Sequence, residues 1–137
     1  MDAQQVARGL GWFSLGLGAA EVLAPGQVSR LVGAPEKEHG GLVRAYGVRE
    51  LVAGVGLLAF PAAAPTWMWA RVAGDVLDIA TAARAEPDEP HGRKRLVNGL
   101  LMLTGVMVVD VLVARALSLP KPPTLAERIK NRLTGKE

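Results

Sequence analysis

The stretch Arg71-Val72-Ala73-Gly74-Asp75-Val76-Leu77-Asp78 decides how this chain folds. It lies in an apolar segment. If that segment is a helix, its charged residues share one face with Gly74, because residues three and four apart are helical neighbours. Two carboxylates and a guanidinium on one apolar helix are costly unless they are paired or hydrated. We therefore expect this helix to lie in the middle of a small membrane protein, with its charges facing inward.

The composition is that of a single apolar domain. The chain has 137 residues, of which 50% are hydrophobic, 21% are charged, 4% are aromatic and 16 are glycine. Chains rich in Gly, Ala, Val and Leu suit close helix packing in lipid. There is no cysteine, which excludes disulfides, thiolate metal sites and cysteine nucleophiles. The net charge of +3 is concentrated in a basic tail, which suits anionic lipid headgroups, and no nucleic-acid-binding motif is present.

Prolines, glycines and polar runs divide the chain into four long predicted helices and a tail. We expect helices over about residues 3–24, 42–60, 66–83 and 94–117, with polar loops at 33–41 and 85–92. Together the four helices are predicted to form a transmembrane domain at residues 1–119. The expected fold is therefore all-α, a four-transmembrane-helix bundle.

Residues 120–137 are predicted to be a basic amphipathic tail. Thr124 and Glu127 have the spacing of a capping box, and Leu125, Ile129 and Leu133 share one face of the helix that would follow. A basic helix of this kind suits a membrane surface, and binding to a partner protein is the alternative.

Small residues are spaced for close helix contacts, with packing positions expected at Gly16, Ala20, Gly47, Gly54 and Gly74. There is also an internal repeat. The pattern Arg8-x-x-Gly11-x-x-x-Leu15-x-x-Gly18 recurs as Arg44-x-x-Gly47-x-x-x-Leu51-x-x-Gly54. A duplicated hairpin and coincidence in a Gly/Leu-rich chain both explain the repeat.

The candidate site is the set of ionisable side chains inside the predicted helices: Glu21, Arg49, Glu50, Arg71, Asp75, Asp78 and Asp110. Ionisable residues at membrane depth are functional-site hypotheses by default. We expect Arg71 to pair with Asp75 one turn away, and Glu50 to meet Arg71 across the hairpin. Asp78 is expected either to meet Arg49 or to stay protonated, because burial disfavours its charged form.

Two interpretations of this cluster stay open. Acidic and basic residues are nearly balanced within the predicted helices, which favours interhelical staples that fix register. The other interpretation is a proton-linked relay, or a polar pocket for a small amphiphile. Asp75-x-x-Asp78 would need a third carboxylate to hold a divalent cation. We predict no catalytic residue, metal site or cofactor.

The strings Gly47-Val48-Arg49-Glu50-Leu51 and Arg71-Val72-Ala73-Gly74-Asp75 resemble small bacterial four-helix membrane proteins of unknown function. These include the family called DUF4267 and the membrane segments found beside cyclase/dehydrase-like START-type domains. The resemblance covers residues 8–115. It implies four spans in a bacterial inner membrane, and it implies no activity and no catalytic residue.

The leading hypothesis is a small integral membrane protein that acts as a non-enzymatic accessory or scaffold subunit. Its expected partners are membrane lipids and either further copies of itself, as a homo-oligomer, or a larger membrane complex, with no nucleic acid. The basic tail favours both termini in the cytoplasm. The alternative is a membrane-embedded enzyme or proton-coupled carrier with a polar pocket on the second to fourth helices. A soluble helical bundle with a basic tail is the third interpretation.

Overall fold

The computed structural model describes residues 2–31, 36–84, 92–120 and 122–135. Within these ranges the chain is all-α, as predicted, and contains no strand. In chain order the elements are α1 (Ala3–Leu23), α2 (Pro25–Leu31), α3 (Glu36–Ala59), the short 3-10 helix η1 (Pro61–Ala63), α4 (Ala64–Ala83), α5 (Gly92–Ser118) and α6 (Leu125–Thr134).

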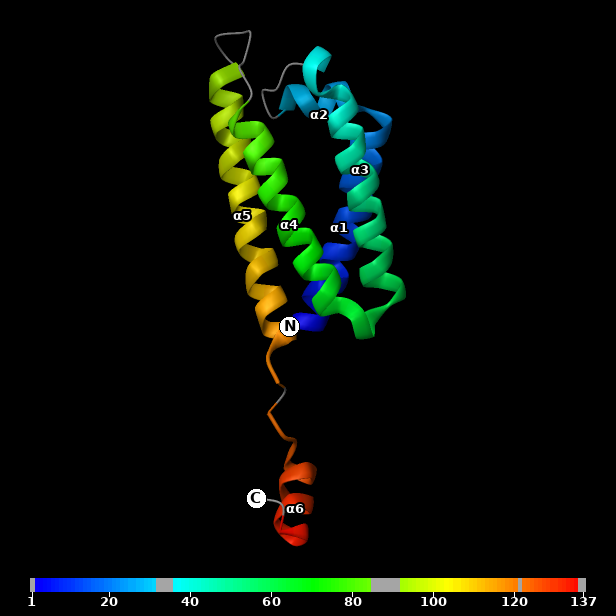
Figure 1. Cartoon of the computed structure of the whole chain (residues 1–137), viewed down its shortest axis with the longest axis vertical. Helices are drawn as coiled ribbons and strands as arrows, with labels where there is room; N and C mark the ends of the chain where they lie inside the picture. The colour runs from blue at the N-terminus through cyan, green and yellow to red at the C-terminus, as the bar shows by residue number, and fades with distance from the viewer. Residues whose placement is uncertain (1, 32–35, 85–91, 121, 136–137) are drawn as a thin grey trace.

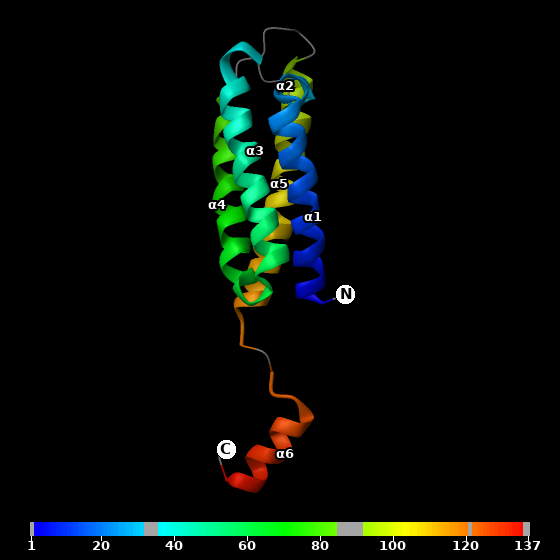
Figure 2. The same ribbon diagram turned by 90° about the vertical axis from the view of Figure 1, so that its right-hand side faces the viewer.

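The four long helices α1, α3, α4 and α5 lie side by side (Figure 1). Contacts are most extensive between α1 and α3 and between α4 and α5, so the core consists of two helix pairs. The pairs meet mainly along α3 and α4. The N-terminus and α6 lie at the same end of the long helices, and α6 projects beyond them (Figure 2). Ion pairs join the two helix pairs at the seam between α3 and α4, Arg49 with Asp78 and Glu50 with Arg71.

Local sequence signals set the ends of the first helices. Asp2 caps α1, and Gln5 completes its capping box. Pro25 begins α2 in the first turn, where its missing N–H removes no helical hydrogen bond. Pro61 separates α3 from α4, because a proline in a helix interior removes a hydrogen bond and clashes with the preceding turn.

The predicted cap of the tail helix is confirmed. The Thr124 side chain accepts a hydrogen bond from the Glu127 backbone, and the Glu127 side chain accepts one from the Thr124 backbone. The helix ends at Gly135, whose φ of +65° is the left-handed conformation that favours glycine. Leu125, Ile129 and Leu133 are all exposed, so the apolar face of α6 is uncovered in the isolated chain.

The loop predicted at 33–41 is wrong for its second part, because α3 begins at Glu36. Glu and Lys are good helix formers, and carboxylates are favourable beside the positive end of a helix dipole. These effects outweigh Gly40 and Gly41, each of which costs a helix about 1 kcal/mol. Most of the loop predicted at 85–92 lies outside the described residues, and α5 begins at Gly92.

The α1–α3 contact is built on glycines. A Cβ added to Gly18 would lie 2.7 Å from the carbonyl oxygen of Gly47, and one added to Gly54 would lie 2.8 Å from that of Gly11. Backbones this close leave no space for a side chain, which is the small-residue packing expected at Gly47 and Gly54. The two helices run antiparallel (Figure 2).

The α1–α3 contact uses equivalent positions of the two copies of the internal repeat. Gly11 and Gly47 occupy equivalent repeat positions, as do Gly18 and Gly54, and each first glycine meets the second glycine of the other helix. Leu15 packs beside Gly54, and the equivalent Leu51 packs beside Gly18. The repeat in the sequence is therefore a repeat in the structure, arranged as a two-fold axis between antiparallel helices would arrange it.

No helix of the described chain packs against Gly16 or Ala20, where a packing role was predicted. Both are exposed, and a Cβ on Gly16 would meet nothing within 4 Å. The contact face of α1 carries Gly11 and Gly18 instead. Two residues correspond to a rotation of about 200° on a helix, so Gly16 and Gly18 point in nearly opposite directions.

By length and apolar composition, one described helix, Arg93–Ser118, is able to cross a membrane, with a mean hydropathy of 2.2 over its most apolar stretch. The segments Gly41–Ala59 and Pro61–Ala83 reach that standard only as a pair, bent by 115° at the break between them. Charged residues inside α1, α3 and α4 lower the mean hydropathy of those helices. One of the four predicted spans is supported in this way, and the other three stay predictions.

Replacing Gly54 with alanine should lower the free energy of unfolding by about 1–3 kcal/mol, because the new Cβ meets backbone that has no room to move. Thermal unfolding of the purified protein measures the change. Gly16→Ala is the matched control. It faces open space and should be neutral or stabilising by up to about 1 kcal/mol. Equal effects of the two substitutions would contradict the glycine interface.

Candidate functional site

Arg71 of α4 is the centre of the candidate site, and its side chain is only 1% exposed. Its Nη1 lies 2.9 Å from Glu50 Oε2 of α3, and its Nε lies 2.8 Å from Asp110 Oδ2 of α5. Nη1 also donates to the hydroxyl of Ser14 on α1, which in turn donates to Glu50 Oε2 at 2.8 Å. One guanidinium thus contacts acceptors from each of the other three long helices.

Arg49 is a second, more open cation beside this centre. Its Nη2 lies 3.0 Å from Glu50 Oε1 and 2.9 Å from Asp78 Oδ2, so it bridges α3 and α4. Its side chain is 26% exposed, and its Nη1 and Nε have no hydrogen-bond partner in the described part of the chain. Arg49 is therefore held less completely than Arg71.

Two neighbours position the Arg49 side chain. The Tyr46 ring lies 5.4 Å from the guanidinium carbon, at the distance of a cation–π contact, and the Tyr46 hydroxyl is hydrogen-bonded to Thr81. On the other side is Gly74, where an added Cβ would collide with Arg49 Nη1. Gly74 thus has the packing role predicted for it, and its partner is a side chain that crosses α4.

The charges inside the core are not balanced. Five carboxyl groups and two guanidinium groups lie buried or half-buried there: Glu21, Glu50, Asp75, Asp78, Asp110, Arg49 and Arg71. The basic residues that balance the count along whole helices are exposed: Arg8, Arg44, Lys94, Arg95 and Arg115. The predicted balance of charge does not hold for the interior, because most of the basic residues on these helices are exposed.

Several carboxyl oxygens of the interior lack a donor. Glu21 Oε2, Asp75 Oδ2, Asp78 Oδ1 and both carboxyl oxygens of Asp110 are buried and accept no hydrogen bond from the residues that the structure describes. Asp75 and Glu21 are 4% and 8% exposed, so little water reaches them. A buried carboxyl oxygen without a partner loses its hydration and regains nothing. The interior is therefore built to accept additional positive charge or donors.

The structure brings all seven predicted residues to the interior of the long helices, although not always with the predicted partner. Glu50 meets Arg71, and Asp78 meets Arg49, as expected. The predicted Arg71–Asp75 pair is wrong, since no ion pair joins them among the described residues. Arg71 extends between α3 and α5 instead, where its guanidinium forms ion pairs with Glu50 and with Asp110.

Three polar residues of this site were missed from the sequence: Ser14, Tyr46 and Thr81. Ser14 carried a usable signal, because it lies three residues after Gly11 and four before Gly18, on the glycine stripe of α1. A hydroxyl on a closely packed face needs a partner from the neighbouring helix. Tyr46 and Thr81 carried no such signal.

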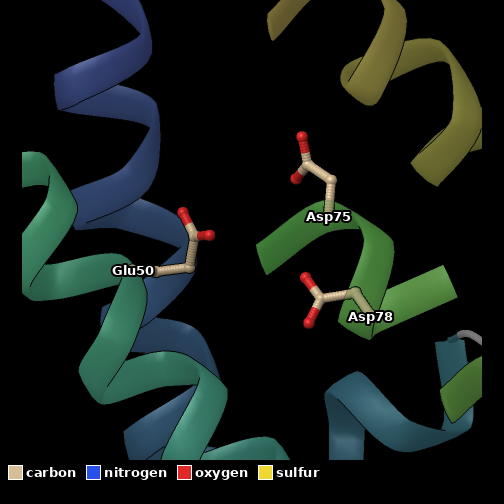
Figure 3. A group of neighbouring side chains, drawn as sticks. All are labelled: Glu50, Asp75 and Asp78. Atoms are coloured by element: carbon tan, nitrogen blue, oxygen red, sulfur yellow. The ribbon is translucent and has the colours of Figure 1, made fainter. Parts of the chain in front are cut away.

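One oxygen from each of Glu50, Asp75 and Asp78 lies within 4.8 Å of the other two. Figure 3 shows the carboxyl groups of Asp75 and Asp78 projecting from α4 into the space that Glu50 enters from α3. A cavity of about 200 Å³ lies between the same two helices, lined by Arg49, Glu50, Arg71 and apolar side chains that include Trp67. The carboxyl groups and the cavity both lie at the seam between the helix pairs.

No protein-family model, no curated protein and no solved structure matches this chain.

Replacing Arg71 with methionine should lower the free energy of unfolding by about 3–5 kcal/mol, because Glu50 and Asp110 lose the charge that compensates their burial. The effect is measurable as a loss of folded protein or of melting temperature. Arg115→Met removes an exposed arginine from α5 and should change stability by no more than about 0.5 kcal/mol. A small effect at Arg71 would show that the buried pairs do not hold the helices together.

Proposed function

We propose that this chain is a multi-pass integral membrane protein. The observation that carries the proposal is an inversion of the usual burial pattern. The interior contains Arg71, Asp110, Glu50 and Ser14, whereas large apolar side chains face outward, among them Trp12, Leu101 and Leu112 at 62%, 67% and 61% exposed. Large apolar side chains exposed in such number are unfavourable in water, and lipid favours them.

Helix lengths agree with this placement. At about 1.5 Å per residue, α1, α3, α4 and α5, with 21, 24, 20 and 27 residues, are about 32, 36, 30 and 40 Å long. The hydrocarbon core of a bilayer is about 30 Å thick. Low hydropathy in α1, α3 and α4 comes from charges such as Glu21, Glu50 and Arg71, which are buried among the helices and need not meet lipid.

The termini and the tail fit a membrane surface. Four spans would return the chain to its starting side, and the N-terminus and α6 do lie at one end (Figure 1). The apolar face of α6 and its basic residues Arg128, Lys130 and Arg132 match an interface rich in anionic lipid. We propose that this side is cytoplasmic. The bacterial inner membrane is proposed on the family resemblance alone.

We further propose that the protein is a non-enzymatic accessory or scaffold subunit. Its central interaction joins all four long helices through Arg71, which suits a rigid body, and its apolar outer faces are available for a homo-oligomer or a larger membrane complex. Purification from the native source in a mild detergent tests this. The result expected is a partner subunit, or a second copy, in stoichiometric amount, and a monomer free of partners would contradict it.

A proton-coupled carrier is the second candidate, and the excess of buried carboxyl groups favours it. In liposomes with a pH gradient, a carrier would dissipate the gradient once its substrate is added. Asp75→Asn would then abolish transport and leave the folded protein intact. For a scaffold, the same substitution should lower stability or assembly and change no proton flux.

Substituting lysine on the outward face of α5 tests whether that face contacts lipid or water. Leu101→Lys and Val108→Lys should each cost about 3 kcal/mol of insertion free energy and reduce the carbonate-resistant fraction in membranes. Leu133→Lys on α6 should leave that fraction unchanged. In a soluble protein the three substitutions would all be near neutral, within about 0.5 kcal/mol. Release of the unmodified protein by carbonate would also overturn the membrane proposal.

A further inference from the structure

We propose that Glu50, Asp75 and Asp78 bind one divalent metal ion of the hard, oxygen-preferring class. This inference goes beyond a scaffold or carrier role. It rests only on side chains inside the core, so it does not depend on the membrane placement.

The positions of the three carboxylates suit a shared ion. One oxygen from each lies within 4.8 Å of the other two. Mg²⁺ and Ca²⁺ bind oxygen at about 2.0–2.6 Å, so two ligands of one ion are at most about 5 Å apart. Asp75 and Asp78 come from adjacent turns of α4, and Glu50 faces them from α3 (Figure 3). The backbone therefore already holds the ligands in place.

Asp75 provides a second, independent indication of a ligand. It is 4% exposed, and its Oδ2 accepts no hydrogen bond within the described chain. Asp78 Oδ1 also lacks a hydrogen-bond partner, and the Asp78 side chain is 13% exposed. Leaving a buried carboxyl oxygen without a partner is costly. An ion supplies the missing partner for both.

The excess of negative charge around the three carboxylates also favours a bound cation. The groups facing the three carboxylates are Arg49 and Arg71, with Glu21 of α1 and Asp110 of α5 as further acids. With all of these ionised, five negative charges face two positive ones. Buried charge of one sign requires compensation, and a divalent ion supplies more of it than any single side chain does.

Arg49 is the competitor of this ion. Its Nη2 contacts Glu50 Oε1 and Asp78 Oδ2, so the guanidinium compensates two of the three ligands when no metal is bound. Metal binding requires Arg49 to withdraw. Its side chain is 26% exposed, two of its nitrogens are unpartnered, and the cavity of about 200 Å³ between α3 and α4 adjoins it. Arg71 need not move, since Asp110 and Ser14 hold it.

The ligand set indicates which metals bind. All three groups are carboxylates, with no sulfur or imidazole ligand among them, and such sets prefer Mg²⁺, Ca²⁺ or Mn²⁺ over copper or zinc. Water would complete the coordination.

Mn²⁺ binding to the purified full-length chain, followed by electron paramagnetic resonance, tests the proposal. The wild type should bind one Mn²⁺ per chain, in competition with Ca²⁺ or Mg²⁺. Asp75→Asn should abolish this binding, and Glu21→Gln, a buried carboxylate outside the three, should preserve it. Absence of Mn²⁺ binding to the wild type, or equal binding to Asp75→Asn, would overturn the proposal.

Arg49→Gln provides the sharper measurement, because it removes the competing cation. Mn²⁺ affinity should rise about tenfold or more. The melting temperature of this variant should be low without metal and should recover when Mn²⁺, Ca²⁺ or Mg²⁺ is added, whereas the double variant Arg49→Gln/Asp75→Asn should not recover. A variant that is destabilised but unaffected by metal would mean that Arg49 is only a staple. If Arg49→Gln fails to fold even with metal, that result also counts against the proposal.

Discussion

Arg71 and its buried acceptors hold the four long helices in one arrangement. Five of the nine buried apolar residues in the described chain are alanines, whose small side chains specify little about the rotation of one helix pair against the other. A planar guanidinium with fixed donor directions removes that ambiguity, because it has to reach Glu50, Asp110 and Ser14 at once. The buried apolar cluster around Leu57, Met68 and Val113 is small by comparison. Specificity here therefore comes from polar contacts more than from the shapes of apolar side chains.

Interior and exterior carry different parts of the charge. Exposed arginines and lysines lie toward the helix ends, and the buried interior keeps an excess of carboxyl groups. A scaffold and a proton-coupled carrier both fit this distribution, since each needs helices fixed by ion pairs. They differ in the role of the excess carboxyl groups. In a scaffold their burial is a permanent energetic cost, whereas in a carrier they bind a proton or a charged substrate. Arg49 is more exposed than Arg71 and has two nitrogens without a hydrogen-bond partner in the described chain. A bound cation would therefore displace Arg49 more easily than Arg71.

Much of this architecture was predictable from the sequence, and the exceptions share a cause. Prolines placed the breaks between helices, and charges on apolar segments identified all seven members of the cluster. The face that each residue occupies was harder, because it depends on rotation about the helix axis. Gly16 and Gly18 both belong to plausible small-residue spacings, and only the neighbouring helix decides between them. Arg71 was assigned the nearby Asp75, whereas its length lets it reach Asp110 on another helix. The sequence predicted a loop over residues 33–41 because of Gly40 and Gly41, whereas α3 begins at Glu36.

The glycine contact between α1 and α3 has the symmetry of an interface between two identical molecules. Because Gly11 meets Gly54 and Gly18 meets Gly47, the interface is self-complementary in the way that an isologous dimer interface is. Two identical helices, each with one copy of the repeat, would form the same contact across a two-fold axis. Here both copies lie in one polypeptide. Within it, α4 and α5 break the symmetry and contribute Asp75, Asp78 and Asp110, three of the five acids. A single polypeptide allows such asymmetry, because a homodimer has to place every charge twice.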